Sequence, residues 1–160
     1  MKNIKTISAK NKIQTVVILK KGNEVLLGFK KRGFGAGLWN GFGGKVEINE
    51  PASSCAKREL FEESGITAKK LLEMGIINFE FTGKSGSIEV HFFLCDSWQG
   101  EPTESEEMIP KWFGSNEIPY GEMWPDDRYW MPLLLDGRKF SGRFVFENNK
   151  ILSKSLLTRD

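Results

Sequence analysis

Residues 43–66, GGKVEINEPASSCAKRELFEESGI, form the stretch with the strongest fold signal in this chain. It opens with a glycine pair, and Pro51 is well placed at the first helical position, where its fixed φ and missing N–H cost little. Residues 52–64 contain neither proline nor glycine, and Gly65 can end a helix at the position after its last turn. The stretch therefore predicts a loop followed by a helix over 52–64.

Three glutamates of the predicted helix, Glu59, Glu62 and Glu63, are spaced so that their carboxylates share one face. Like charges this close raise each other's pKa and destabilise an isolated helix. A bound cation relieves this repulsion, and Mg²⁺ is usually held by a few carboxylates together with substrate phosphates. Arg58, one turn before Glu62, can hold a carboxylate through a forked hydrogen bond. Taken alone, an E-x-x-E-E pattern is more typical of a solvated acidic face.

The spacing of the whole stretch is far more specific than its acidic part. It matches the signature of the Nudix hydrolases at nine constrained positions over 23 residues: Gly44, Glu50, Arg58, Glu59, Leu60, Glu62, Glu63, Gly65 and Ile66. By this resemblance the fold is α+β, an α/β/α sandwich around a mixed, curved sheet. The activity implied is hydrolysis of a diphosphate linked to another group, with Mg²⁺ as the cofactor and Mn²⁺ as an alternative metal.

The composition indicates one soluble, folded domain. Of 160 residues, 39% are hydrophobic and 28% are charged, which is too apolar for a disordered chain. We expect a polar N-terminal tail over residues 1–12 and a single domain over residues 13–160. No apolar run has the length of a membrane span, and the basic N-terminus lacks the apolar segment of a secretory signal. We therefore expect a cytoplasmic protein that does not bind membranes.

Charge, cysteine and histidine content argue against several classes of function. The 23 basic and 21 acidic residues give a net charge of +2, which does not favour a nucleic acid polymer as partner. Cys55 and Cys95 form no C-x-x-C motif, so we expect no zinc site and a reducing compartment. His91, the only histidine, has no G-x-S-x-G partner motif and is expected to be a strand residue without a catalytic role. A monomer acting on a small molecule is the simplest expectation.

Segments of β-branched and alternating apolar residues predict a sheet around the helix. For example, Phe79 and Phe81 lie on one face of the same predicted strand. Residues 30–37 predict a basic, glycine-rich loop. Pro125 can begin a second helix, and Pro132 should kink or interrupt it. The expected strands cover residues 13–19, 24–29, 38–42, 71–81, 88–96, 111–113, 142–147 and 151–157.

Further segments resemble one branch of the family, the vertebrate-type oxidised purine nucleoside triphosphate hydrolases, also called 8-oxo-dGTP diphosphatases. The likeness covers nearly all of residues 13–158 and is most specific in MWPDDRYWMPLLL at 123–135. It is also carried by KKRGFGAGLWNGFGGKV at 30–46, FEF at 79–81 and ESEEM at 104–108. The resemblance implies hydrolysis of 8-oxo-dGTP and 2-oxo-dATP to the monophosphate and pyrophosphate, which sanitises the nucleotide pool.

This resemblance also implies roles for individual residues. Glu63 and Glu59 would activate water, with Arg58 as their catalytic neighbour. The implied metal ligands are the Gly43 carbonyl, Glu59, Glu62, Glu63 and Glu107. The implied substrate contacts are Lys30 near the phosphates, the backbone at Phe42, Gly43, Gly44 and Lys45, and a base pocket of Thr15, Phe34, Asn40, Phe79, Trp124, Asp126 and Asp127.

A purine pocket at these positions is also physically reasonable. Trp124 can stack on a base, which is worth about 1–3 kcal/mol, and Asn40 offers both a donor and an acceptor. The adjacent carboxylates Asp126 and Asp127 repel each other in a dry pocket, so one can hold a proton at neutral pH. Sharing that proton would let one pair recognise several oxidised purines. The alternative for the two aspartates is simple helix capping.

Two other readings remain open from the sequence. One is a Nudix hydrolase for another substrate, such as ADP-ribose, a dinucleoside polyphosphate or capped RNA. The other is a nucleotide sensor without catalysis, although a sensor would be expected to lack one of the three helix glutamates. Ile88 stands where a methionine can line the pocket in the family, which leaves the preference among oxidised purines undetermined.

Overall fold

A curved mixed sheet of eight strands dominates the computed structural model, which describes residues 11–159. The strand order is β3-β2-β1-β5-β4-β7-β8, with β6 paired to β2. The pairs β1–β5 and β4–β7 are parallel, and the remaining pairs are antiparallel. The strands are β1 (Asn11–Lys21), β2 (Glu24–Lys30), β3 (Trp39–Asn40), β4 (Thr67–Phe81), β5 (Ser87–Gln99), β6 (Met108–Gly114), β7 (Lys139–Glu147) and β8 (Lys150–Arg159).

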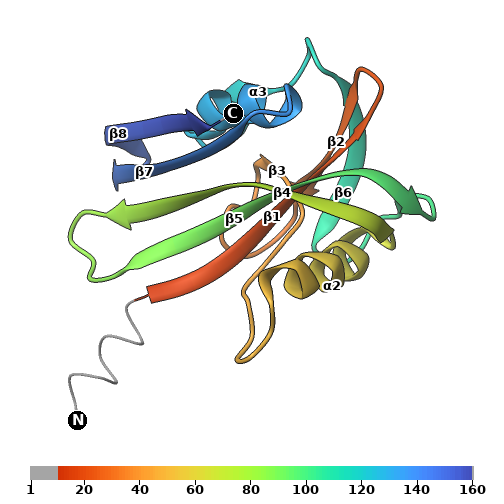
Figure 1. The fold of residues 1–160 in the computed structure, drawn as a ribbon, viewed down its shortest axis with the longest axis horizontal. Helices are drawn as coiled ribbons and strands as arrows, with labels where there is room; N and C mark the ends of the chain where they lie inside the picture. Colours follow the sequence, from red (N-terminus) through yellow and green to blue (C-terminus); the bar gives the residue numbers. More distant parts are fainter. Residues whose placement is uncertain (1–10, 160) are drawn as a thin grey trace.

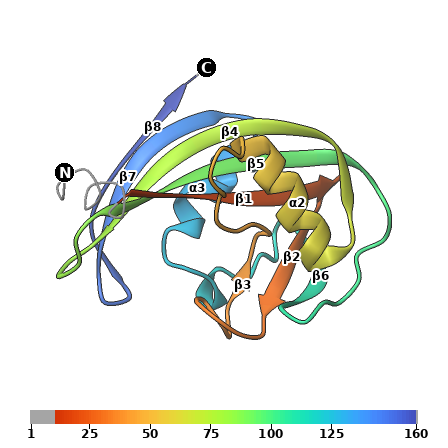
Figure 2. The same ribbon diagram turned by 90° about the horizontal axis from the view of Figure 1, so that it is seen from below.

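The helices lie on opposite faces of this sheet (Figures 1 and 2). They are α2 (Ala52–Ser64), the short 3₁₀ helix η1 (Tyr120–Glu122) and α3 (Asp127–Leu135). Successive side chains of β1 point to opposite faces of the sheet and contribute to both apolar cores. Val17 packs in the core under α2 with Leu60, and Ile18 packs in the core under α3 with Trp130. The predicted α/β/α sandwich around a mixed sheet is confirmed. None of the helices within residues 11–159 is long and apolar enough to cross a membrane.

The helix α2 has the predicted bounds, but Pro51 does not have the predicted role. Pro51 is extended, with ψ of 148°, and caps the helix from outside rather than occupying the first helical position. Its carbonyl accepts hydrogen bonds from the N–H groups of Ser54 and Cys55, so the missing proline N–H again costs nothing. At the other end Gly65 has φ of 78° and donates to the Phe61 carbonyl, as expected of a glycine that ends a helix.

The eight predicted strands are present, but each differs from the prediction in at least one of its bounds. Of the predicted strand 38–42, only Trp39 and Asn40 form a strand, and Phe42 makes a separate, isolated bridge with Val17. Strand β4 begins at Thr67 instead of residue 71, and its pairing to β5 contains three register shifts. Such bulges break the alternation from which its start would be read. Of the predicted tail, residues 1–10 lie outside the described part of the chain, whereas residues 11 and 12 belong to β1.

Helix α3 begins two residues later than predicted and runs through its proline. Pro125 lies in the preceding turn, and Asp126 is the residue at the helix start. Pro132 does not interrupt the helix, which continues to Leu135. A proline at this point removes one hydrogen bond close to the first turn. Burial of Trp130, Met131 and Leu134 against the sheet offsets that loss.

The absence of a side chain at Gly75 allows β7 to lie close to β4. A methyl group added at this position is therefore expected to lower the stability of the fold. A Cβ atom at Gly75 would meet the ring of Phe140 at 2.5 Å and its carbonyl oxygen at 2.6 Å. We expect Gly75→Ala to lower the free energy of unfolding by about 1–3 kcal/mol, measured by chemical denaturation. Gly121→Ala, where nothing lies within 4 Å of the new Cβ, is the matched control. A Gly75→Ala protein as stable as this control would contradict the packing.

Candidate active site

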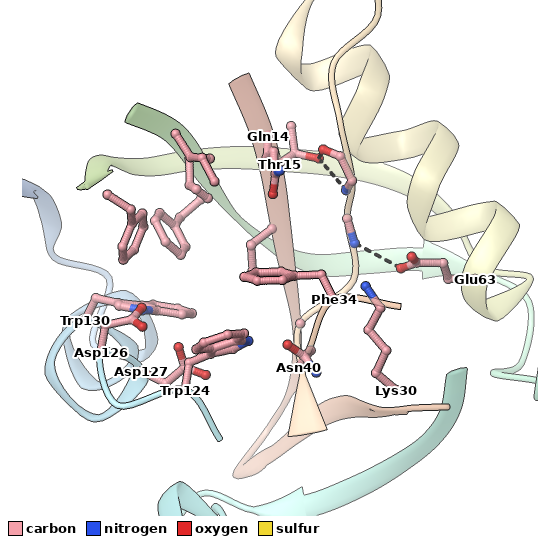
Figure 3. A pocket seen from close by; sticks show the side chains of 18 of the residues that line it. Gln14, Thr15, Lys30, Phe34, Asn40, Glu63, Trp124, Asp126, Asp127 and Trp130 are labelled. Atoms are coloured by element: carbon pink, nitrogen blue, oxygen red, sulfur yellow. Dashed lines mark hydrogen bonds between the residues drawn. The ribbon is translucent and has the colours of Figure 1, made fainter. Parts of the chain in front are cut away.

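A pocket opens on the α3 side of the sheet, with strands β1, β4, β5 and β7 behind it (Figure 3). Acidic and aromatic side chains from the segment 124–130 close one end, and Glu63 and Lys30 lie at the other. The lining residues are Gln14, Thr15, Val16, Lys30, Phe34, Asn40, Gly41, Gly43, Gly44, Glu63, Phe79, Phe81, Ile88, Val90, Phe92, Met108, Trp124, Asp126, Asp127, Trp130 and Phe146. The pocket is therefore apolar on its sheet side and polar at both ends.

Asp126 and Asp127 are both buried in this pocket, each only 6% exposed. The indole Nε1 of Trp130 donates a 2.8 Å hydrogen bond to Asp126 Oδ2. Burial raises the pKa of both carboxyls, and the charge of Asp126 raises the pKa of Asp127 further. The indole donor favours the ionised form of Asp126. Burial and the charge of Asp126 therefore favour the protonated form of Asp127, and the indole donor favours Asp126 as the acceptor of the pair. Neither side chain caps the helix, so simple capping does not explain them.

The aromatic part of the pocket mouth is formed by Trp124 and Phe34. Their ring centroids lie 5.0 Å apart with an interplanar angle of 27°, although Phe34 comes from the distant loop after β2 and is 68% exposed. Beside them, Asn40 Nδ2 donates 2.8 Å to the Leu38 carbonyl. This bond fixes the amide and leaves its oxygen to accept. The arrangement offers a flat stacking surface next to a fixed hydrogen-bonding group.

The loop that carries Gly43 and Gly44 is pressed against β1. A Cβ atom at Gly43 would lie 1.8 Å from the Thr15 carbonyl oxygen, so only glycine fits there. The Thr15 N–H donates 2.9 Å to the Gly44 carbonyl, and the Thr15 hydroxyl lies 3.4 Å from the Cys55 thiol of α2. Thr15 is thus buried beneath the loop and ties β1 to both the loop and the helix.

Arg58 organises the acidic groups of α2. Its guanidinium donates a forked pair of hydrogen bonds to Glu50, at 2.9 and 3.0 Å, and a further 2.9 Å bond to Glu59. The Arg58 bonds lower the pKa of Glu50 to about 2. The carboxylate oxygen Oε1 of Glu62, one turn further along the helix, lies 3.5 Å from Arg58 Nη1. The forked partner of Arg58 is therefore Glu50, which explains why the signature spaces these two residues eight apart.

Glu63 differs from its neighbours because it is 5% exposed and faces the pocket. The Gly43 N–H donates 3.0 Å to its Oε1. Burial raises the pKa of Glu63 to about 8, and the negative charges of Glu59 and Glu107 act in the same direction. In the metal-free protein Glu63 therefore holds a proton more readily than a solvent-exposed glutamate does.

The donor set suits a hard divalent cation. Glu59, Glu62, Glu63, Glu107 and the Gly43 carbonyl offer only oxygen atoms, which Mg²⁺ and Mn²⁺ prefer. Within residues 11–159 no three acidic, cysteine or histidine side chains already stand close enough together to hold an ion. Glu59 faces Arg58, and Glu107 lies 4.0 Å from Arg32, so binding would require these side chains to turn.

Most sequence-predicted substrate residues meet in this pocket, with two exceptions. Phe42 is fully buried under α2, and its backbone N–H and carbonyl both pair with Val17. Lys45 forms a bridge with Gln14 and is absent from the lining. Of the predicted metal ligands, Glu63 and Gly43 line the pocket, whereas Glu59, Glu62 and Glu107 do not.

Sequence reasoning missed several lining residues. They are Gln14, Val16, Gly41, Phe81, Val90, Phe92, Met108, Trp130 and Phe146. Trp130 could have been found, because it lies four residues after Asp126 on a predicted helix. The alternation of the 79–81 segment also pointed to Phe81. Gln14, Val16, Val90, Phe92 and Phe146 reach the pocket through strand pairings between distant segments.

The absence of a side chain at Gly44 leaves space for the carboxylate of Glu59. We therefore expect an added methyl group at this position to impair activity without impairing folding. A Cβ atom there would lie 2.5 Å from the Glu59 carboxyl carbon. Because this group is the far end of a flexible side chain, it can move away at little cost in stability. We expect Gly44→Ala to lower kcat about 10- to 100-fold, by misplacing the carboxylate, with an unchanged melting temperature. An activity equal to that of Gly121→Ala would show that Glu59 need not lie there.

Known proteins share both the sequence pattern and the fold. The NUDIX domain model matches residues 10–134. The oxidized purine nucleoside triphosphate hydrolase of Mus musculus is 52% identical over 147 residues, covering 91% of this chain and 94% of the relative. The protein of the same name from Danio rerio is 48% identical over 142 residues, covering 89% of this chain and 91% of the relative. The crystal structure of the mutator MutT protein of Bacillus halodurans has a TM-score of 0.82 and 28% identity, covering 91% of this chain and 97% of that one. Nudix hydrolases generally need divalent cations, in agreement with the oxygen donors of α2. The chain therefore belongs to the Nudix hydrolase family.

Proposed function

We propose that this protein hydrolyses oxidised purine nucleoside triphosphates, of the 8-oxo-dGTP and 2-oxo-dATP type, to the monophosphate and pyrophosphate. The observation that carries the proposal is the buried pair Asp126 and Asp127 at one end of an aromatic pocket whose other end holds Glu63. The names of the mouse and zebrafish relatives support the same substrate class. A net charge of +2 supports a free nucleotide rather than a polymer as the partner. A monomeric state and a cytoplasmic location are part of this proposal.

The base would lie in the apolar half of the pocket. Trp124 and Phe34 provide the stacking surface, and Asn40 and the aspartate pair provide hydrogen bonds at the base edge. Because Asp127 donates while Asp126 accepts, the pair suits a base edge that carries an acceptor beside a donor. Movement of the shared proton would reverse the two roles and suit the tautomers that oxidation produces.

The phosphates would lie at the end of the pocket formed by Lys30, Gly43, Gly44 and Glu63. Mg²⁺, with Mn²⁺ as an alternative, would be held by the Gly43 carbonyl and by Glu59, Glu62, Glu63 and Glu107. When bound, such an ion neutralises phosphate charge and makes water a stronger nucleophile. Arg58 holds Glu59 by a 2.9 Å hydrogen bond in the metal-free protein, and Glu59 would turn from it to the ion. The Gly43 N–H orients Glu63, which is placed to take a proton from water.

The direct test is pyrophosphate release from 8-oxo-dGTP, 2-oxo-dATP and dGTP in the presence of Mg²⁺. We expect the oxidised nucleotides to react at least about tenfold faster than dGTP, and chelation by EDTA to abolish all turnover. Equal rates on all three would keep the hydrolase and contradict the sanitising role. Nucleotide binding without incorporation of ¹⁸O from labelled water would instead identify a sensor.

A further inference from the structure

Gln14 places a carboxamide in the pocket where the sheet side is otherwise apolar. It lies on β1 and pairs with Val90 of the parallel strand β5. Strand alternation puts it on the same face as Val16, which packs with the core under α3. Ile88 and Val90 of β5 line the pocket beside it. The Gln14 side chain is partly exposed, so its amide is accessible to a ligand that enters the pocket.

Within residues 11–159 the Gln14 side chain makes no hydrogen bond. The other two pocket residues with a neutral hydroxyl or carboxamide group both bond within the protein: Thr15 contacts the Cys55 thiol, and Asn40 donates to the Leu38 carbonyl. The acidic residues of the pocket also have partners, such as Trp130 for Asp126 and the Gly43 N–H for Glu63. Among the hydroxyl and carboxamide side chains that line the pocket, only that of Gln14 makes no hydrogen bond within residues 11–159.

The position of Gln14 along the pocket selects the part of the ligand that it meets. Its backbone forms a bridge with Lys45, directly after Gly43 and Gly44, at the proposed phosphate end. Figure 3 shows it across the pocket from Asn40, between the aspartate pair and Glu63. In a nucleotide the sugar connects the base to the phosphates, so the sugar passes through this middle region.

We propose that Gln14 hydrogen-bonds the sugar 3′-hydroxyl of the nucleotide and is a specificity-determining residue for that group. This inference rests on the proposed function, which places the base and the phosphates at the two ends. A hydroxyl both donates and accepts, as a carboxamide does, so the two groups match whichever way the amide is turned. A bound nucleotide without this hydroxyl would cover the amide and leave it without a partner, which weakens binding.

The test compares kcat/KM for 8-oxo-dGTP and for its 2′,3′-dideoxy analogue in the wild type, Gln14→Met and Gln99→Met. Methionine keeps the length of the side chain and removes the amide, and Gln99 is an exposed glutamine outside the pocket. We expect the wild type and Gln99→Met to prefer the 3′-hydroxyl nucleotide by about 3- to 10-fold. Gln14→Met should lose this preference, because its kcat/KM should fall for 8-oxo-dGTP and stay unchanged for the dideoxy analogue.

Other outcomes would overturn the inference. If Gln14→Met kept the wild-type ratio, or slowed equally on both nucleotides, Gln14 would not recognise the hydroxyl. Melting temperatures of the three proteins show whether an equal loss reflects damage to the fold. Failure of the proposed function would look different, because the wild type would then react no faster with 8-oxo-dGTP than with dGTP. The hydroxyl preference would in that case be measured on dGTP and its dideoxy analogue.

Discussion

Replacing Glu63 with glutamine is expected to lower kcat on 8-oxo-dGTP by about a thousandfold or more. Glutamine keeps the shape of the side chain, and its amide oxygen can still accept from the Gly43 N–H. It cannot take a proton from water or balance the charge of a divalent cation. Of the predicted catalytic residues, which are all among the described residues 11–159, Glu63 is the one that lines the pocket. Pyrophosphate release at saturating nucleotide and Mg²⁺ gives the measurement.

The same substitution should not destabilise the metal-free protein. Burial raises the pKa of Glu63 to about 8, which means that its ionised form is disfavoured in the folded state. A neutral amide avoids this cost, so the melting temperature in EDTA should stay the same or rise. Glu24→Gln, at an exposed position on β2, is the control for both measurements. A Glu63→Gln enzyme within threefold of this control would remove Glu63 from the catalytic machinery.

The sequence was most informative where structure depends on local spacing. The bounds of α2 follow from Pro51 before it and from Gly65 with its left-handed backbone after it. The signature also marked Glu50 and Arg58, but not that they form a forked pair, because Glu50 lies outside the helix at the end of a loop whose path the spacing does not predict. Pro132 shows a limit of local rules, because burial of the α3 face against the sheet outweighs one missing hydrogen bond.

Most of the candidate site depends on contacts that local patterns do not contain. Gln14 lines the pocket because β1 pairs in parallel with β5, and Phe146 does so because β7 pairs in parallel with β4. Parallel partners are joined by long connections, so their register cannot be read from a turn. The resemblance to a known branch pointed to Phe34 and Trp124, although these two residues are 90 positions apart. Spacing alone could not bring them together.

Replacing Asp127 with asparagine is expected to stabilise the protein at neutral pH and to impair its activity. Burial and the charge of Asp126 raise the pKa of Asp127 well above its usual value in the folded state. Ionisation of Asp127 therefore costs more in the folded protein than in the unfolded chain, which lowers the stability of the wild type as the pH rises above the usual range of an aspartate. Asparagine does not titrate and leaves Asp126 ionised beside two donors. We expect the free energy of unfolding to rise by about 1–2 kcal/mol at pH 7.5.

The gain should vanish below about pH 4, the usual range of an aspartate, where both states of the wild type are protonated. It should grow as the pH rises from there, as chemical denaturation at several pH values would show. In contrast, kcat/KM on 8-oxo-dGTP should fall about 10- to 100-fold, because the pair can no longer exchange its proton with the base. Asp136→Asn, exposed at the end of the same helix, should change neither quantity. A pH-independent loss of stability with normal activity would mean that Asp127 supports α3 and does not recognise the base. An aspartate with a purely structural role would not raise stability and lower activity when it is replaced by asparagine.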